Sequence, residues 1–278
     1  KCRVVIVSPL IALMVDQVAS LKQLGIHRAV AITSLMTEAE KNYILSTLNE
    51  YQFIFVSPEM LQAPRFFKQL SKLEIGLLVV DEAHCISQWG YDFRSDYLFI
   101  GKMRKSLKNP RTLALTATAT TQVVHDIYTF LGLDQNKTTY FQGYAFLKNR
   151  EIDVISVEGL RSKMLSELLK RVDFPCIVYA ATIKEIEGLK EALLGEGFTK
   201  IDTFHSKRHS SDRQTIQQKF FRGELNILLA TSAFGMGINQ SNIRTIIHYQ
   251  LPQTLEDCVQ QIGRAGRDLQ FSRCIAFV

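Results

Sequence analysis

Hydrophobic residues gather in short runs that recur along the whole chain. These runs are rich in valine, isoleucine and leucine, and we name them as predicted strands: Arg3 to Ser8, Phe53 to Ser57, Ile75 to Asp81, Thr112 to Thr116, Cys176 to Ala180, Asn226 to Thr231, Arg244 to Tyr249 and Arg273 to Val278. Continuous apolar runs of this length are typical of strands that are buried on both faces of a parallel sheet.

Longer segments with helical periodicity separate these runs. They include Leu10 to Leu24, Gln122 to Leu131, Lys184 to Leu194 and Asp212 to Phe221. Strands that alternate with helices predict an α/β fold built on mostly parallel sheets flanked by helices. The rhythm pauses between Asp134 and Arg150, so we predict two domains, residues 1–145 and 146–278, whose sheets face each other across a cleft.

Length and composition agree with two globular domains. The chain has 278 residues and is 46% hydrophobic, enough for two cores of roughly 100 to 150 residues each. Its formal net charge is +6, which suits a polyanionic partner without proving one. The five cysteines lie far apart with no zinc-ligand spacing, and no apolar stretch is long enough to span a membrane. These features predict a soluble intracellular protein with free thiols.

Two adjacent carboxylates follow one predicted strand, in the string Val79-Val80-Asp81-Glu82-Ala83-His84. Open α/β sheets bind ligands at the carboxyl ends of their strands. In nucleotide hydrolysis one acid holds Mg²⁺ and the next activates the attacking water, so Asp81 is the metal candidate and Glu82 the candidate base. The alternative is an ordinary strand end with solvated acids.

A loop with unusual aromatic content comes directly after the acids. It carries Trp89, the only tryptophan of the chain, together with Phe93 and Arg94. Aromatic rings and arginine suit base stacking and phosphate contact. Composition alone leaves a second interpretation open, in which Trp89 and Phe93 pack into the core.

The string DEAHCISQWGYDFRSDY, residues 81–97, resembles motif II of the RecQ helicases and the aromatic-rich loop that follows it in that family. One departure is Tyr91, where the family usually has histidine. The resemblance extends over nearly the whole chain. It implies two RecA-like domains and adds His84 to the catalytic candidates.

Two strand-to-helix turns, Ser8 to Val18 and Val56 to Glu59, resemble motifs Ia and Ib of the same family. The resemblance implies that Ser8, Pro9, Gln17 and Ser57 contact DNA. Backbone N–H groups at the start of a helix can bind a nucleic-acid phosphate. Serine and proline are also ordinary helix starters, so the residues alone leave both interpretations open.

Other motifs follow in the family order. Residues 115–120 resemble motif III and make Thr116 a DNA-contact candidate, with a plain helix-capping turn as the alternative. Residues 230–239 resemble motif V and add Thr231 for DNA and the pair Gly235 and Gly237 for nucleotide, although a lone Gly-x-Gly is weak support. A looser match at residues 204–207 adds His205 for DNA.

Residues 260–268, QQIGRAGRD, resemble motif VI and imply roles for Gln260, Arg264 and Arg267. Arginines three positions apart would share one face of a helix. Opposite a bound triphosphate, Arg267 would act as an arginine finger with Arg264 as its companion. The alternative is a solvated basic helix. Gln261 departs from the glutamate that is usual in the family.

The phosphate-binding string G-x-x-x-x-G-K-[ST] does not occur in the sequence. The chain also opens and closes on predicted strands, so we expect it to be an excerpt of a longer motor, and we expect the 278 residues alone to hydrolyse ATP poorly.

The resemblance implies an ATP-dependent DNA helicase that moves 3′ to 5′, uses ATP and Mg²⁺, binds single-stranded and duplex DNA, and serves DNA repair and recombination. It would work in the cytoplasm of a bacterium or the nucleus of a eukaryote. Two rivals remain at this point. One is an RNA-unwinding ATPase of the DEAD or DEAH kind, against which the loop from Cys85 to Arg94 argues. The other is a nucleic-acid-binding module without turnover.

Overall fold

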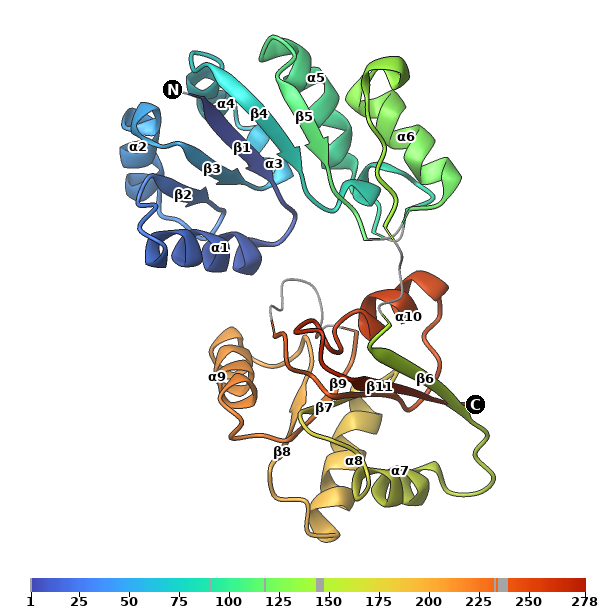
Figure 1. The fold of residues 1–278 in the computed structure, drawn as a ribbon. Helices are drawn as coiled ribbons and strands as arrows, with labels where there is room; N and C mark the ends of the chain where they lie inside the picture. Colours follow the sequence, from blue (N-terminus) through green and yellow to red (C-terminus); the bar gives the residue numbers. More distant parts are fainter. Residues whose placement is uncertain (1, 91, 118, 144–147, 233, 235–239) are drawn as a thin grey trace. The chain divides into compact units, whose positions relative to one another are not determined.

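The computed structural model describes the chain apart from residues 1, 91, 118, 144–147, 233 and 235–239. It divides into two compact units, Lys1–Gln142 and Gly143–Val278. Both units are α/β, as the alternation of apolar runs and helical segments predicts (Figure 1). The residue at which we predicted the domain boundary, 145, lies outside the described residues.

Unit 1 is built on a five-stranded parallel sheet with the order β2-β3-β1-β4-β5. Its strands are β1 (Arg3–Val7), β2 (Ala29–Ile32), β3 (Phe53–Val56), β4 (Ile75–Val80) and β5 (Arg111–Ala114). Its α-helices are α1 (Ile11–Gln23), α2 (Glu38–Ser46), α3 (Pro58–Leu61), α4 (Pro64–Leu70), α5 (Leu98–Ser106) and α6 (Thr121–Leu131). Short 3₁₀ helices are η1 (Leu48–Glu50), η2 (Ala83–Ile86), η3 (Ser95–Tyr97) and η4 (Gln135–Lys137).

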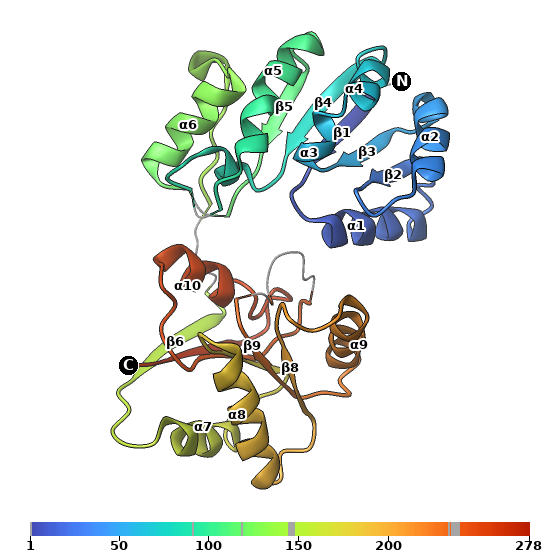
Figure 2. The ribbon, with the colours of Figure 1, turned by 180° about the vertical axis from the view of Figure 1, so that it is seen from behind.

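Helices cover both faces of this sheet, seen from two sides in Figures 1 and 2. Helix α1 packs on one face, where Met14 and Val18 contact Phe55 and Ala29. Helices α2 to α6 supply the larger core on the other face. Because both faces are covered, the central strands need apolar residues at nearly every position, which is why their runs stand out in the sequence.

Unit 2 is built on a six-stranded parallel sheet with the order β6-β11-β10-β7-β9-β8. Its strands are β6 (Arg150–Ile155), β7 (Cys176–Tyr179), β8 (Ile201–Phe204), β9 (Ile227–Ala230), β10 (Thr245–His248) and β11 (Ser272–Phe277). Its helices are α7 (Arg161–Leu169), α8 (Ile183–Gly195), α9 (Ser210–Phe221) and α10 (Leu255–Ile262).

Alternate residues of strand β7 serve the two cores of unit 2. Cys176 and Val178 pack with helices α7 and α8, whereas Ile177 and Tyr179 pack with α9 and α10. This is the period-two alternation of a strand buried on both faces. All strands of one parallel sheet end at the same edge, so residues that follow the strands are brought together there.

Candidate functional site

The first predicted acid sits at the carboxyl edge of the sheet in unit 1. Asp81 directly follows β4, and its N–H donates to the carbonyl of Val7 at 2.9 Å. The hydroxyl of Ser8, which follows the neighbouring strand β1, donates to Asp81 Oδ2 at 3.0 Å. Ser8 is fully buried. Its hydroxyl therefore orients the carboxylate, and its position gives no support to our expectation of a DNA contact.

The backbone turns sharply at the second acid. Glu82 has φ 47° and ψ 47°, a left-handed conformation that is uncommon for a residue with a side chain. Asp81 Oδ1 accepts from the N–H of Glu82 at 3.0 Å, and the Tyr97 hydroxyl donates to the Asp81 carbonyl at 2.9 Å. The N–H of Ala83 donates to Leu115 O at 2.8 Å. These bonds hold the turn in its strained shape.

His84 links the turn at Asp81 and Glu82, called the acid turn below, to the segment after β5. Its Nδ1 lies 2.9 Å from Thr116 Oγ1 and 3.3 Å from Glu82 Oε2. The ring is buried, and burial lowers the pKa of His84 against the opposing effect of Asp92 and Asp81. In a ring that stays neutral at pH 7, Nδ1 can donate to Glu82 or Thr116, or accept from the Thr116 hydroxyl, depending on the tautomer. His84 therefore connects the candidates from motifs II and III.

The aromatic loop presents its tryptophan to solvent. The side chain of Trp89 is 76% exposed, so the interpretation in which Trp89 packs into the core is wrong. Phe93 is 38% exposed. Gly90 is required where it stands, because a Cβ at this position would overlap the carbonyl oxygen of His84. The loop therefore folds back closely on the acid turn.

Arg94 is tied into the base of this loop. Its Nε and one terminal nitrogen donate to Asp92 Oδ2 at 2.9 and 2.8 Å. The other terminal nitrogen donates to Pro9 O at 3.4 Å, which joins the loop to the turn after β1. Pro9 itself is buried. Arg94 thus combines a structural contact with a partly exposed positive charge.

The other motif candidates in unit 1 differ in accessibility. Gln17 is exposed on α1 and Thr116 is partly exposed. Ser57 is buried, and its hydroxyl accepts from Met60 N at 3.4 Å as the N-cap of α3. Ser57 therefore fits the alternative of a helix starter.

Both predicted arginines of unit 2 lie beyond the end of a helix. Helix α10 ends at Ile262, and Arg264 and Arg267 stand in the turn that follows. Our expectation that they share a helical face is wrong, and so is the alternative of a solvated basic helix. The turn breaks the helix because Ala265 pairs with Ile243 and because Gly266, with φ 58°, adopts a left-handed conformation.

The turn that contains Arg264 and Arg267 is called the arginine turn below. Two residues that sequence analysis missed hold it in shape. Arg150 donates to Ala265 O at 2.7 Å and to Gly263 O at 3.2 Å, on either side of Arg264. Asn149 donates through Nδ2 to Gly266 O at 2.9 Å and to Gln270 O at 2.7 Å. Nothing local in the sequence marks Asn149 and Arg150, since their partners lie more than 110 positions later.

The two arginines differ in burial. Arg264 is 6% exposed, whereas Arg267 is exposed and donates through Nε to Gly263 O at 3.2 Å. Desolvation and the nearby charges of Arg264 and Arg150 lower the pKa of Arg267, although an arginine stays protonated. Concentrated positive charge of this kind favours an anionic ligand. Gln260 is partly exposed on α10, and Gln261 is buried.

The remaining candidates of unit 2 follow strands β8 and β9. His205 is buried, and its Nε2 lies 3.0 Å from Glu187 Oε1. Thr231 is partly exposed, and its N–H donates to Phe204 O at 3.3 Å. Gly235 and Gly237 lie outside the described residues.

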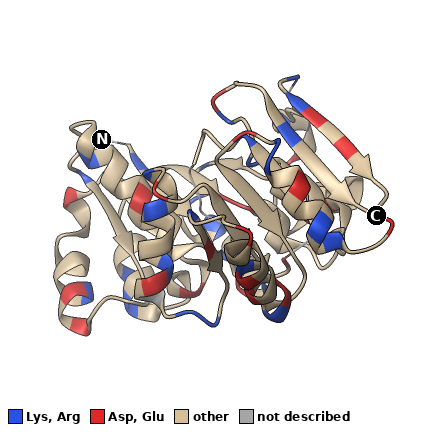
Figure 3. Ribbon diagram, turned by 90° about the horizontal axis from the view of Figure 1, so that it is seen from below, with Lys and Arg blue, Asp and Glu red and all other residues tan. Residues whose placement is uncertain are grey.

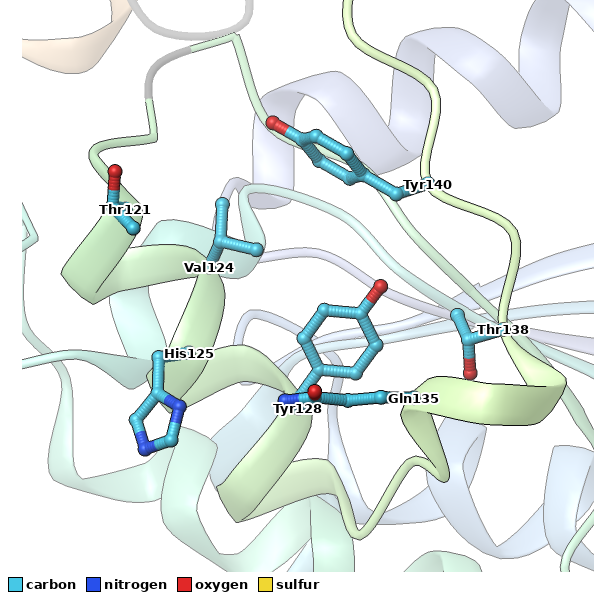
Figure 4. A pocket seen from close by; sticks show the side chains of 7 residues that line it. All are labelled: Thr121, Val124, His125, Tyr128, Gln135, Thr138 and Tyr140. Carbon is cyan, nitrogen blue, oxygen red and sulfur yellow. The ribbon is translucent and has the colours of Figure 1, made fainter.

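A separate hollow of about 450 Å³ lies against α6 (Figure 4). Its lining consists of Thr121, Val124, His125, Tyr128, Gln135, Thr138 and Tyr140. None of the predicted site residues belongs to it.

Metal, membrane and thiol features add little to the candidate site. Among the described residues, no group of three or more histidines, cysteines or acids could hold a metal ion, and no helix is long and apolar enough to cross a membrane. All five cysteines are free, as expected. Burial raises the pKa of the Cys85 thiol to about 12, so this neighbour of the acids is not a nucleophile. Along the ribbon in Figure 3, the positions of lysine and arginine are interspersed with those of aspartate and glutamate.

Comparison with known proteins identifies both units. The DEAD/DEAH box helicase family matches residues 1–127, and the helicase conserved C-terminal domain matches residues 160–268. The chain is 40% identical over 270 residues to "Probable ATP-dependent DNA helicase RecS" of Bacillus subtilis, covering 95% of this chain and 53% of that protein. It is 37% identical over 275 residues to the ATP-dependent DNA helicase RecQ of the same organism, covering 98% and 46%.

The chain therefore spans about half the length of the curated relatives it matches. Among solved structures, the DUF1998 helicase MrfA bound to DNA has a TM-score of 0.77 at 14% identity, covering 100% of this chain and 40% of that one. The helicase Lhr of Mycobacterium smegmatis, bound to single-stranded DNA and AMP-PNP, has a TM-score of 0.75 at 20% identity, covering 99% and 40%. These two likenesses confirm the fold, two RecA-like α/β domains.

Proposed function

Because the chain belongs to the RecQ family of helicases, we propose that it forms the motor of an ATP-dependent DNA helicase. In this proposal the motor moves 3′ to 5′ along single-stranded DNA and separates the duplex. One observation carries most of the weight. The acid turn, a buried His84 and an exposed Trp89 lie within ten residues of sequence, and Ser87 joins His84 to Trp89 by bonds to the His84 carbonyl and from the Trp89 N–H. Such an assembly suits a motor in which DNA contact alters hydrolysis.

In the proposed reaction Asp81 would hold Mg²⁺, directly or through water, and Glu82 would activate the water that attacks the γ-phosphate of ATP. One or two carboxylates are enough for Mg²⁺, because the phosphates and waters supply the other ligands. The bond from Ser8 fixes one oxygen of Asp81. His84 positions Glu82 by its contacts to Oε2 and to Thr116.

The arginine turn supplies positive charge to the same nucleotide in this proposal. Arg267, whose side chain is exposed, neutralises the charge that develops on the transferring phosphoryl group, and Arg264 supports it. By resemblance to motifs V and VI, Gly235 and Gly237 complete the nucleotide contacts and Gln260 has a catalytic role. Catalysis would then require both units.

We assign DNA contact to the exposed or partly exposed candidates. Trp89 and Phe93 stack on bases, Arg94 contacts phosphate, and Gln17, Thr116 and Thr231 lie at motif positions with accessible side chains. Ser8, Pro9, Ser57 and His205 are buried, so we give them supporting roles behind that surface.

ATP hydrolysis further requires a phosphate-binding loop, and the string G-x-x-x-x-G-K-[ST] does not occur in these 278 residues. We therefore propose that residues 1–278 alone turn over ATP slowly or not at all. A protein in which such a loop precedes these residues, called the loop-containing protein below, would be active. Robust turnover by residues 1–278 with saturating single-stranded DNA would contradict this.

Strand displacement by the loop-containing protein tests the function. We expect unwinding of a duplex with a 3′ single-stranded tail, dependent on ATP and Mg²⁺, and little unwinding of the same duplex with a 5′ tail. Single-stranded DNA should stimulate hydrolysis far more than RNA of the same sequence. Equal stimulation by RNA would favour an RNA-unwinding ATPase, and DNA binding with no turnover would favour a binding module.

A further inference from the structure

The aromatic loop is fastened to helix α6 by a single buried serine. The hydroxyl of Ser87 donates to Asp126 Oδ2 at 2.6 Å and accepts from the N–H of Trp89 at 3.1 Å. The Ser87 carbonyl also accepts from the N–H of Gly90 at 2.9 Å. Ser87 is fully buried, so its hydroxyl has no water to replace a lost partner. Ser87 therefore connects Asp126 to the backbone of the tryptophan.

Asp126 also accepts a hydrogen bond within its own helix, through its other oxygen. Its second oxygen, Oδ1, accepts from Gln122 Nε2 at 3.0 Å, one helical turn earlier on α6. Helix α6 begins at Thr121, shortly after Leu115 and Thr116, which bond to Ala83 and His84 of the acid turn. The acid turn is thus tied to the segment that leads into α6, and the aromatic loop is tied to α6 itself.

The exposure of Trp89 makes this connection consequential. A ring that is 76% exposed has few packing contacts to fix its direction, so its placement depends on how firmly its backbone is held. The bond from the Trp89 N–H to the Ser87 hydroxyl is one such restraint. The charged carboxylate of Asp126 accepts from the same hydroxyl and so fixes its orientation.

We propose that Asp126 is a positioning residue for DNA recognition, which acts through Ser87 to hold Trp89 where a base can stack on it. Asp126 touches neither ATP nor DNA in this account. The inference rests on the proposed function, since it assigns Trp89 a DNA base as its ligand.

Intrinsic fluorescence offers a direct test, because Trp89 is the only tryptophan in the chain. In residues 1–278 without DNA, Asp126→Ala and Ser87→Ala should each lower the steady-state anisotropy of Trp89 at unchanged far-ultraviolet circular dichroism. Gln122→Ala is the matched control, since it removes a neighbour of the same carboxylate but leaves the bond to Ser87. Its anisotropy should stay at the parent value.

Titration with single-stranded DNA supplies the second arm. Asp126→Ala should weaken binding by about tenfold, within the range for loss of one stacked base, and Asp126→Asn should recover part of it because an amide oxygen can still accept from Ser87. Adding Asp126→Ala to Ser87→Ala should cause little further loss, since both changes break one connection.

Unchanged anisotropy and unchanged DNA affinity in a folded Asp126→Ala variant would overturn the proposal. If Asp126→Ala fails to fold, the comparison of Ser87→Ala with Gln122→Ala decides in the same way, because Ser87→Ala breaks the same connection. A parent chain that binds no DNA would contradict the proposed function and the DNA role of Asp126, whereas the anisotropy arm would still decide whether Asp126 positions Trp89.

Discussion

The acid turn of unit 1 and the arginine turn of unit 2 are held in different ways. The acids follow a buried strand directly, and the partners of the Asp81 carboxylate are Ser8, just after the neighbouring strand, and the N–H of the next residue. The arginines lie in an irregular turn that is shaped by Asn149, Arg150 and Ile243. One region owes its geometry to the sheet, and the other owes it to side chains that reach in from the start of β6.

This difference predicts different sensitivity to substitution. A sheet edge keeps its shape when one side chain changes, because the ladder bonds of the backbone remain. A turn that depends on a few side-chain bonds to its carbonyls loses its shape when one donor is removed. Substitution of a residue that supports the arginine turn should therefore lower activity more than substitution of a residue that supports the acids.

The largest effect is expected at Arg267. In the loop-containing protein, Arg267→Ala should lower kcat by roughly 10³-fold or more and leave ATP affinity within several-fold, because its charge acts mainly in the transition state. Arg267→Lys should rescue little, since a lysine cannot reproduce the planar fork of donors. Single-turnover hydrolysis with a nucleotide titration measures both, and an unchanged kcat would remove the arginine-finger assignment.

Glu82 should follow closely. Glu82→Gln removes the proposed base while keeping the size of the side chain and its contact with His84. We expect kcat to fall by about 10²- to 10⁴-fold, as for loss of a general base, with ATP binding retained. Hydrolysis that persists near the parent rate would assign Glu82 to the solvated acids of an ordinary strand end.

Arg150 supports the arginine turn through bonds to its backbone carbonyls, and its substitution comes next in expected effect. Arg150→Ala removes two charge-assisted bonds to carbonyls beside Arg264, so kcat should fall by about 10- to 100-fold. The matched control is Arg273→Ala on β11. Arg273 pairs with the exposed Glu151 and the partly exposed Asp153, so this substitution should be nearly silent. Equal effects of the two substitutions would mean that the turn keeps its shape without Arg150.

The smallest effect is expected at Ser8, which supports the carboxylate of Asp81. Ser8→Ala removes one bond to Asp81 but leaves the bond from the Asp81 N–H to Val7 and the ladder of β4. The Mg²⁺ concentration for half-maximal hydrolysis should rise by about two- to tenfold, with kcat little changed. A loss as large as that of Arg150→Ala would contradict the contrast between the two turns.

The same contrast explains what the sequence could predict. The central strands and the places of Asp81 and Glu82 follow from local pattern. Each observed strand ends only one or two residues before the end of the apolar run that predicted it. The strands that the pattern missed, β2, β6 and β8, are all edge strands. Polar residues interrupt the pattern of β6, whereas β2 and β8 are buried at all but one position each and are only four residues long, too short to stand out as runs.

The arginine turn could not be predicted, because its shape depends on contacts between distant positions. A spacing of three is typical of one helical face, but α10 stops at Ile262, where the chain turns to pair Ala265 with Ile243. The exposure of Trp89 was likewise open, because a tryptophan in a sequence fits both a core and a binding loop. Only the folded chain distinguishes these cases.

We propose that the acids of unit 1 and the arginines of unit 2 serve one nucleotide. A crystal structure of the loop-containing protein with single-stranded DNA, Mg²⁺, ADP and a fluoride analogue of the transferring phosphoryl group tests it most directly. We predict Asp81 at the Mg²⁺ ion or one of its waters, Glu82 at the attacking water, and the Arg267 guanidinium within about 3 Å of the analogue. An Arg267 side chain in solvent, with the analogue bound to unit 1 alone, would contradict the account.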